Sequence, residues 1–166
     1  MASEIGVQNI QHTNGTTAIT IDSSGNITAS GNIITPARPS FQVGFTTSAW
    51  VQPSTNTDIA FDDVFFDTGN NYSTSTGRFT APVDGVYYFG GKVYLMNGSA
   101  TSNFVVGKNG ATDSRRYYVQ SENIAADNTA TISEMFDLTA GDYVSILWSS
   151  GQYYTRHSTF NGYLIG

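Results

Sequence analysis

The chain of 166 residues contains no cysteine, only four prolines and few charged residues. Without cysteine there can be no disulfide framework, no thiolate zinc site and no cysteine nucleophile. The net charge of −6 argues against nucleic-acid binding, because phosphate recognition depends on a basic surface. The adjacent basic pair Arg115-Arg116 is too small a patch to change that conclusion.

The chain also lacks long apolar runs and recognisable catalytic motifs. No stretch approaches the roughly 20 apolar residues of a membrane span, and Met1–Ile10 lacks the features of a secretory signal, so we expect a soluble product made in the cytoplasm. The two histidines, His12 and His157, form no metal-binding pattern, and there is no P-loop, dinucleotide fingerprint or G-x-S-x-G motif. We therefore expect no enzymatic activity and no cofactor.

Three carboxylates, Asp62, Asp63 and Asp67, lie close together in the sequence. Asp62 and Asp63 are adjacent in a strand-like segment and should point to opposite faces, so they are not expected to share a proton. A weak calcium site built from this loop is one interpretation. Solvated turn carboxylates are the favoured interpretation, because the spacing of known calcium loops is missing.

What the chain has in abundance favours strands. About a third of its residues are Ser, Thr and Asn, which favour strands, turns and caps over helix interiors. Seventeen glycines add turns, and the ten Tyr, ten Phe and two Trp add strand preference. The alternating patterns predict an all-β sandwich or jelly roll with strands at Phe41–Phe45, Val64–Phe66, Val86–Met96, Phe104–Val106, Arg116–Gln120, Thr131–Phe136, Tyr143–Trp148 and Phe160–Ile165.

The longest predicted strand assigns its side chains to two faces. Alternation places one set of apolar residues in the core, namely Tyr87, Phe89, Val93 and Leu95. The opposite set faces solvent or a neighbouring subunit and consists of Tyr88, Lys92 and Tyr94.

The composition changes near Pro36–Pro39, which divides the chain into a segment of residues 1–38 and a domain of residues 39–166. The first segment has too few apolar residues to build its own core. It is either a flexible linker or a strand-turn repeat that orders only against a partner, as in a three-chain shaft or on a docking surface. In the second case its isoleucines would make the attachment: Ile19, Ile21, Ile27 and Ile33.

Phe61–Phe89 reads FDDVFFDTGNNYSTSTGRFTAPVDGVYYF and closely resembles the signature of the complement-one-q globular head, a member of the tumour necrosis factor-like jelly rolls. Further matches occur in order along residues 39–166. They are Phe41-x-Val43-Gly44, Lys108-Asn109-Gly110, Leu138-x-x-Gly141-Asp142-x-Val144 and Phe160-x-Gly162-x-Leu164.

This resemblance implies a ten-stranded jelly roll that associates as a homotrimer. The aromatic content is consistent with that, because 22 aromatic residues exceed what one modest core needs. The candidates for the subunit interface are Tyr88, Tyr94, Tyr143 and Trp148, since Tyr and Trp suit interfaces with one dry and one wet side.

The leader TNGTTAITIDSSGNITASGNI contains no collagen-like Gly-x-y run and is similar to segments of bacteriophage tail-fibre and other virion structural proteins. It predicts a non-enzymatic phage protein at the virion surface, attached to other virion proteins by residues 1–38. The head would be a short fibre tip or a capsid decoration. The alternative is a cellular tumour-necrosis-factor-like ligand or a bacterial surface adhesin of the same fold, and an enzyme such as a depolymerase ranks third.

Binding of a host glycan or protein is one interpretation of the aromatic residues in the head. The segment Trp148–Thr159 gathers aromatic and basic residues around a predicted hairpin, and Trp50 joins them if two loops meet. The candidate receptor contacts are Trp50, Tyr153, Tyr154, Arg156 and His157. The competing interpretation, which we favour, is that these rings pack the trimer.

Overall fold

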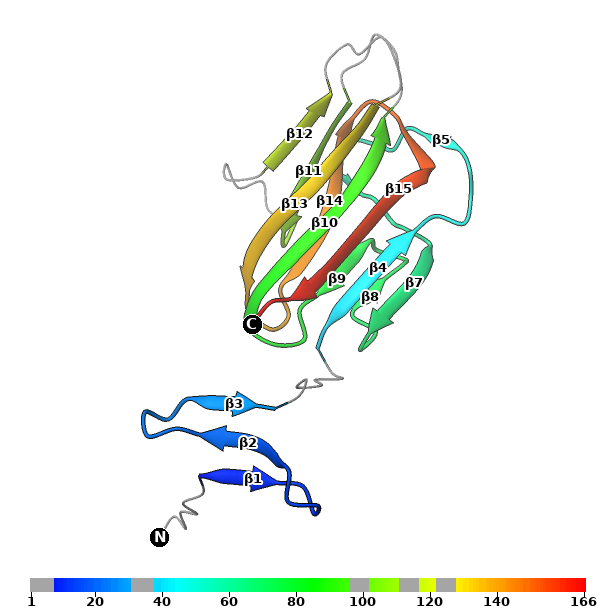
Figure 1. Cartoon of the computed structure of the whole chain (residues 1–166). Coiled ribbons are helices and arrows are strands. Elements are labelled where there is room, and N and C mark those ends of the chain that lie inside the picture. Colours follow the sequence, from blue (N-terminus) through cyan, green and yellow to red (C-terminus); the bar gives the residue numbers. More distant parts are fainter. Residues whose placement is uncertain (1–7, 31–37, 96–101, 111–116, 122–127) are drawn as a thin grey trace. The chain divides into compact units, whose positions relative to one another are not determined.

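The computed structural model describes residues 8–30, 38–95, 102–110, 117–121 and 128–166, shown in colour in Figure 1. The chain divides into two compact units, Met1–Pro36 and Ala37–Gly166, here called the N-terminal unit and the globular unit. Every element in the described ranges is a strand, so the expected all-β class is confirmed. Over the same ranges no helix is long and apolar enough to cross a membrane.

The N-terminal unit is a three-stranded antiparallel sheet of β1 (Asn9–Gln11), β2 (Thr17–Ile21) and β3 (Ile27–Ala29), with β2 in the middle. Asp22 shapes the turn between β2 and β3, because its carboxylate accepts the backbone N–H groups of Ser24 and Asn26 at 2.9 and 2.8 Å. Hydrogen bonding from the Asn26 side chain, and then from these N–H groups, lowers the pKa of Asp22. These strands and turns agree with the strand-turn alternative for residues 1–38.

The globular unit is a sandwich of two six-stranded sheets (Figure 1). Sheet I has the order β13-β10-β15-β4-β7, with β5 paired to β15, and sheet II has the order β12-β11-β14-β9-β8, with β6 paired to β14. The strands are β4 (Ser40–Gly44), β5 (Trp50–Val51), β6 (Thr57–Asp58), β7 (Asp63–Thr68), β8 (Tyr72–Ser73), β9 (Arg78–Thr80), β10 (Gly85–Leu95), β11 (Ser102–Lys108), β12 (Tyr117–Ser121), β13 (Asn128–Leu138), β14 (Tyr143–Ser150) and β15 (Tyr153–Leu164). The expected count of ten strands is not confirmed, because this unit has twelve described strands, three of them only two residues long.

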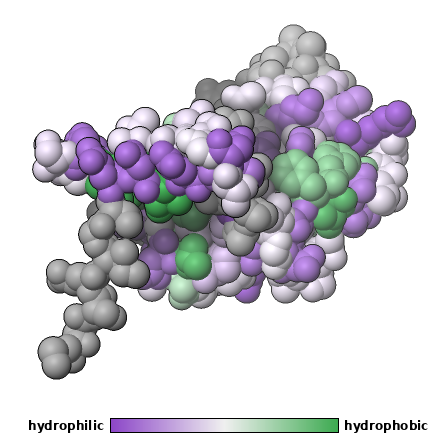
Figure 2. All heavy atoms as spheres, turned by 60° about the horizontal axis from the view of Figure 1, so that its bottom comes forward, coloured by the Kyte–Doolittle hydropathy of each residue, from purple (hydrophilic) through white to green (hydrophobic). Residues whose placement is uncertain are grey.

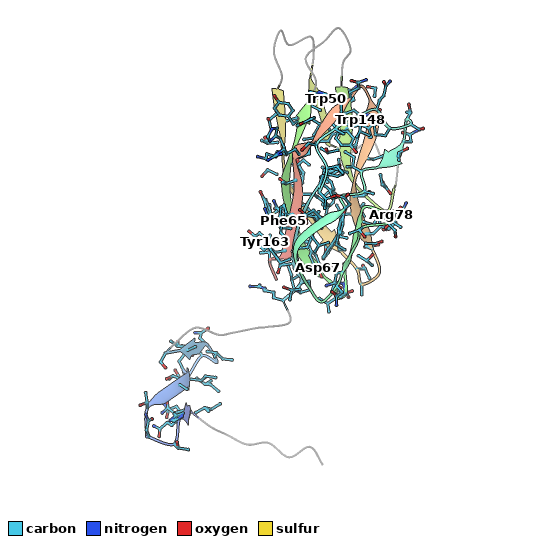
Figure 3. All side chains as sticks on the ribbon, turned by 90° about the vertical axis from the view of Figure 1, so that its right-hand side faces the viewer. Trp50, Phe65, Asp67, Arg78, Trp148 and Tyr163 are labelled. Carbon is cyan, nitrogen blue, oxygen red and sulfur yellow. The ribbon has the colours of Figure 1, made fainter. Side chains whose placement is uncertain are left out.

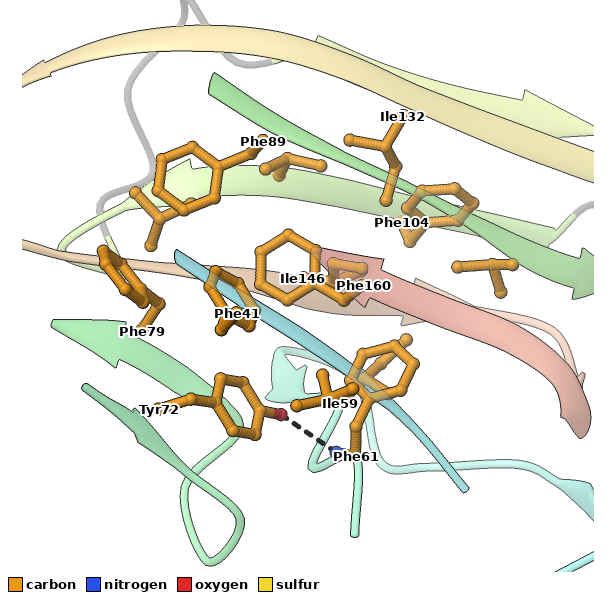
Figure 4. Close-up of a cluster of buried hydrophobic side chains, with 14 of the residues drawn as sticks. Phe41, Ile59, Phe61, Tyr72, Phe79, Phe89, Phe104, Ile132, Ile146 and Phe160 are labelled. Carbon is orange, nitrogen blue, oxygen red and sulfur yellow. Dashed lines mark hydrogen bonds between the residues drawn. The ribbon is translucent and has the colours of Figure 1, made fainter. Parts of the chain in front are cut away.

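Aromatic rings fill the space between the two sheets (Figure 4). Phe41 of sheet I stacks on Phe79 and Tyr72 of sheet II, with ring centroids 4.8 and 5.3 Å apart. The Tyr72 hydroxyl accepts the backbone N–H of Phe61 at 3.1 Å, and burial raises the pKa of Tyr72. Ten aromatic residues are buried among the described positions, so one subunit's core holds many of the rings that composition assigned to an interface.

Strand β10 has the two faces that alternation predicts. The side chains of Tyr87, Phe89, Val93 and Leu95 are fully buried, whereas Tyr88, Lys92 and Tyr94 are not. The first set faces sheet II, and the second set belongs to the outer face of sheet I, the face turned away from the core.

The turn between β8 and β9 requires glycine at position 77, because of both the backbone angle and the neighbouring atoms. Its φ is +73°, and a Cβ there would lie 2.4 Å from the carbonyl oxygen of Ile59. Gly77 also donates its N–H to the Ser73 carbonyl at 2.8 Å, which closes the turn.

The last strand is longer than predicted. The sequence pattern predicts a strand at Phe160–Ile165 after a hairpin loop, but β15 begins at Tyr153. Only Gly151 and Gln152 separate β14 from β15, so the segment expected to be a binding loop lies mostly within sheet I.

Candidate functional site

The carboxylates near β7 act as acceptors for the loops around them. Asp62 accepts the backbone N–H and the hydroxyl of Thr46, both at 2.9 Å. Asp67 accepts the backbone N–H groups of Asn71 and Tyr72 at 3.0 and 2.8 Å. These hydrogen bonds assign both side chains a structural role, and the described residues contain no group of three or more potential metal ligands.

The outer face of sheet I carries an apolar region at one end. Tyr163, Tyr88 and Met135 lie side by side across β15, β10 and β13, and the two tyrosine rings are 5.4 Å apart. Met135 is 65% exposed, although a methionine on a sheet face usually packs against a covering layer. Val86, next to Met135 across the strand pair, is also exposed.

The apolar region continues at the edge strand β7, where Phe65 and Phe66 are exposed. Val64 is exposed too, but it pairs with the buried Val43 and so belongs to the other face. The Phe65 ring lies over Gly44 of β4, so closely that a Cβ on Gly44 would be 2.8 Å from it. Phe66 pairs with Gln42 on the outer face. In Figure 2 the hydrophobic residues of the visible surface gather in green patches among purple hydrophilic ones.

Sheet II has a different outer surface. None of its described side chains is among the exposed large hydrophobic residues. Arg78 hydrogen-bonds Asp58 at 2.8 Å, which raises the pKa of Arg78, and its guanidinium lies 4.2 Å from the centre of the Tyr143 ring. Figure 3 shows Phe65 and Tyr163 on one side of the sandwich and Arg78 on the other. Tyr143 is therefore not on the surface that bears Tyr88 and Tyr94.

A second feature of sheet I is an aromatic cluster formed by Trp50, Tyr94, Tyr154 and His157. Trp50 and Tyr154 face each other across β5 and β15 with centroids 5.0 Å apart, and Tyr94 follows on β10. His157 lies 5.3 Å from Tyr94 and 5.5 Å from Tyr154. The structure thus brings three predicted receptor contacts together with one predicted trimer contact.

A wide bulge in β15 builds this cluster. The register changes from Lys92 opposite Thr159 to Tyr94 opposite Tyr154, which leaves residues 155–158 without regular partners on β10. The buried Ser158 hydroxyl accepts the Tyr94 N–H at 3.0 Å and donates to the Tyr154 carbonyl at 2.7 Å.

Thr155 secures the other side of the bulge. Its hydroxyl accepts the Ala49 N–H at 2.9 Å and donates to the Thr47 carbonyl at 2.8 Å, which holds the segment before Trp50 in place. Arg156 and His157 are left exposed beside each other, and Arg156 donates to the Ser48 hydroxyl at 3.4 Å. Neither Thr155 nor Ser158 was expected from the sequence to contribute to this site.

Two predicted surface residues are instead in the core. Trp148 has no exposed surface and Tyr153 only 5%, and their rings lie 5.1 Å apart. Burial raises the pKa of Tyr153 to about 12. Trp148 shares the inward face of β14 with Val144 and Ile146, so the assignment of Trp148 to the trimer interface and of Tyr153 to receptor contact was wrong.

The attachment candidates that fall in described residues share one face of the N-terminal sheet. Ile19 and Ile21 alternate along β2, and Ile27 pairs with Ile21. Ile33 lies outside the described residues.

A protein-family model described as "C1q domain" matches residues 40–165. Among curated proteins, the human "Complement C1q and tumor necrosis factor-related protein 9B" is 28% identical over 144 residues, covering 81% of this chain and 41% of the relative. The "Uncharacterized protein YqcC" of Bacillus subtilis is 30% identical over 114 residues, covering 63% of this chain and 30% of the relative. The chain therefore spans less than half the length of these relatives.

Two solved structures show the same fold. The globular domain of zebrafish complement 1qA protein superposes with a TM-score of 0.58 at 21% identity, over 77% of this chain and 98% of that one. The Eiger TNF structure from S. frugiperda superposes with a TM-score of 0.61 at 16% identity, over 78% of this chain and 94% of that one.

Proposed function

Because the chain belongs to the C1q domain family, we propose that it is a non-enzymatic homotrimer displayed on the surface of a bacteriophage particle. The globular unit would form the exposed head, and residues 1–38 would join it to other virion proteins. The observation that supports the trimer is that, within the strands of the sandwich, the exposed large apolar side chains lie on sheet I and not on the described part of sheet II.

The surface that we assign to subunit contact is the apolar region on the outer face of sheet I, which bears Tyr163, Tyr88 and Met135 and continues to β7. Phe65, Tyr163 and Met135 together expose more apolar area than isolated surface residues normally do. A face of this kind is stabilised when a second apolar surface removes it from water. Tyr88 lies in this region and stays a predicted interface residue, and Tyr143 lies on sheet II. Tyr94 was predicted as an interface residue but belongs to the aromatic cluster, whose role is tested separately below.

Light scattering of the full chain tests this assembly. The wild type should give three times the chain mass of 17.9 kDa. Met135→Lys should dissociate the trimer, because it places three charges in the apolar contact. Thr80→Lys is the matched control, since Thr80 is exposed on sheet II. A monomeric wild type, or equal behaviour of the two variants, would contradict the proposal.

The virion location is supported by the leader, which is similar to phage structural segments, and by the existence of a bacterial relative. Labelled antibody on purified particles tests it. Signal at the tail would indicate a short fibre tip, and signal over the head shell would indicate a capsid decoration. Absence from particles would contradict this role.

The second candidate function is a cellular ligand or adhesin of the same fold, which the similarity to the human relative favours. It requires the protein on or outside cells that carry no phage. Fractionation of such cells separates the two functions, because a virion component is made only during phage production.

The aromatic cluster is the part of the head that we assign to a host glycan or protein. Flat rings beside a cation can stack on and hydrogen-bond to a sugar or a protein side chain, and Arg156 and His157 are both exposed. Tyr154→Ala and Arg156→Ala should abolish host binding while the mass stays that of a trimer. Loss of assembly in both variants would instead assign the cluster to subunit packing. Release of oligosaccharide from host polysaccharide would contradict the non-enzymatic role.

A further inference from the structure

The N-terminal sheet gathers its isoleucines on one face, with Thr17 at the end of that face and Ala18 on the opposite one. Ile10, Ile19 and Ala29 form one row across the three strands, and Ile21 pairs with Ile27 in the next row on the same face. The opposite face presents one row of polar residues, Asn9, Thr20 and Thr28.

Among residues 8–30, which are the described part of this unit, the isoleucines at the edges of the aliphatic face are uncovered. Ile27 is 66% exposed and Ile10 is 49% exposed, and the strands are only three to five residues long. A single layer of three short strands is marginal in water unless its apolar face packs against another layer. The stability of this sheet therefore depends on a partner surface.

The chemistry of the face favours a copy of itself as that partner. The ionisable side chains in residues 8–30 are His12 and Asp22, and both lie in turns rather than on the aliphatic rows. Identical copies can therefore approach with no like-charge repulsion and no buried charge. Branched aliphatic side chains on flat strands pack well against one another.

The short connection to the globular unit also favours a copy of the same sheet as the partner. Eight residues separate Ser30 from Pro39, so the reach between the units is at most about 3.3–3.6 Å per residue. In a trimer of globular units, three copies of the N-terminal sheet are held at an effective concentration in the millimolar range. An external virion protein would have to compete with that concentration.

We propose that the aliphatic faces of three N-terminal sheets pack against one another to form a three-chain shaft with a dry core of isoleucine. This inference rests on the trimer proposed above. It assigns Ile19, Ile21 and Ile27 to contacts between copies rather than to attachment, and it leaves the polar face of Thr20 and Thr28 on the outside, available to the particle.

Single introduced cysteines test the shaft, because the chain has no cysteine of its own. Ala29 lies on the aliphatic face and its neighbour Thr28 on the polar face, so Ala29→Cys and Thr28→Cys form a matched pair. Both variants of the full chain are treated with a short bifunctional maleimide and analysed on denaturing gels. We expect covalent two-chain products from Ala29→Cys at least tenfold faster than from Thr28→Cys.

The outcomes separate this inference from the proposed trimer. A protein with the mass of three chains in which both cysteines react equally, or in which neither reacts, overturns the shaft and leaves the trimer standing. Cross-linking of Ala29→Cys to another virion protein instead of to itself also overturns the shaft. A monomeric mass contradicts the trimer itself. As a second readout, Ile27→Ser should slow cross-linking in the Ala29→Cys background, whereas Thr20→Ser should not.

Discussion

Replacing Tyr72 by phenylalanine should measure the contribution of one buried hydrogen bond to this fold. The change keeps the ring that stacks on Phe41 and removes only the hydroxyl that accepts the Phe61 N–H at 3.1 Å. The Phe61 N–H is then left without its acceptor in the core, which costs about 1–3 kcal/mol. Urea unfolding at fixed protein concentration should show a midpoint lower by roughly 1 M, given slopes of about 1–3 kcal/mol/M.

The pH dependence of the same variant provides an independent check. Burial raises the pKa of Tyr72 in the folded state above its unfolded value near 10. The wild type therefore has the full contribution of Tyr72 below pH 10 and loses it as the pH rises further, because the unfolded chain ionises first. The phenylalanine variant has no such loss, so the stability difference between the two proteins should shrink above pH 10.

Tyr163→Phe is the control, because it removes a hydroxyl from an exposed side chain. It should change the free energy of unfolding by less than about 0.5 kcal/mol. The reasoning is refuted if Tyr72→Phe costs no more than Tyr163→Phe at pH 7, or if the difference from wild type is the same at pH 8 and pH 11.

Three further predictions concern a turn, a carboxylate and the proposed interface. Gly141→Ala should lower the free energy of unfolding by about 1–2 kcal/mol, because its positive φ is unfavourable for alanine. Gly77→Ala should lower it further, because the added Cβ would also collide with the Ile59 carbonyl oxygen, and thermal unfolding of both variants measures the difference. Hydrogen bonding from Lys108 lowers the pKa of Asp142 to about 2. The free energy of unfolding of the wild type should therefore fall as the pH drops from 4 toward 2, and that of Asp142→Asn should fall less over the same range. Phe65→Ser should weaken trimer association by about 2.5 kcal/mol per subunit, because about half of the roughly 200 Å² surface of Phe65 is exposed and available for burial in the contact. Analytical ultracentrifugation over a dilution series measures this, and dissociation equal to that of the wild type would contradict the prediction.

Much of the globular fold could be predicted from local patterns. Alternation in β10 assigns its core face correctly, because the strand is long and β13 pairs with it along its whole length. The turn at Asn109-Gly110 is also predictable, since both residues have positive φ, which these residue types tolerate. The start of β15 was not predictable, because the Ser/Thr-rich residues before Phe160 show no regular alternation.

The site was only partly predictable, for two different reasons. Tyr143 and Trp148 are five positions apart on one strand and so point to opposite faces, a parity that the sequence alone could have used to reject one of them. The aromatic cluster depends instead on a bulge whose hydrogen bonds come from the hydroxyls of Thr155 and Ser158. In a chain rich in Ser and Thr, nothing distinguishes these two residues before the fold is known.

The bulge in β15 places residues that the fold needs directly beside residues that it does not need. Thr155 and Ser158 are buried and hold the backbone, so their replacement would disturb the strand pairing. Arg156 and His157 lie between them with exposed side chains and contribute nothing to the core cluster. Substitutions at these two positions can therefore accumulate without loss of the fold. A protein that must follow changes in the surface it recognises could diversify there first, as an antibody does in its loops.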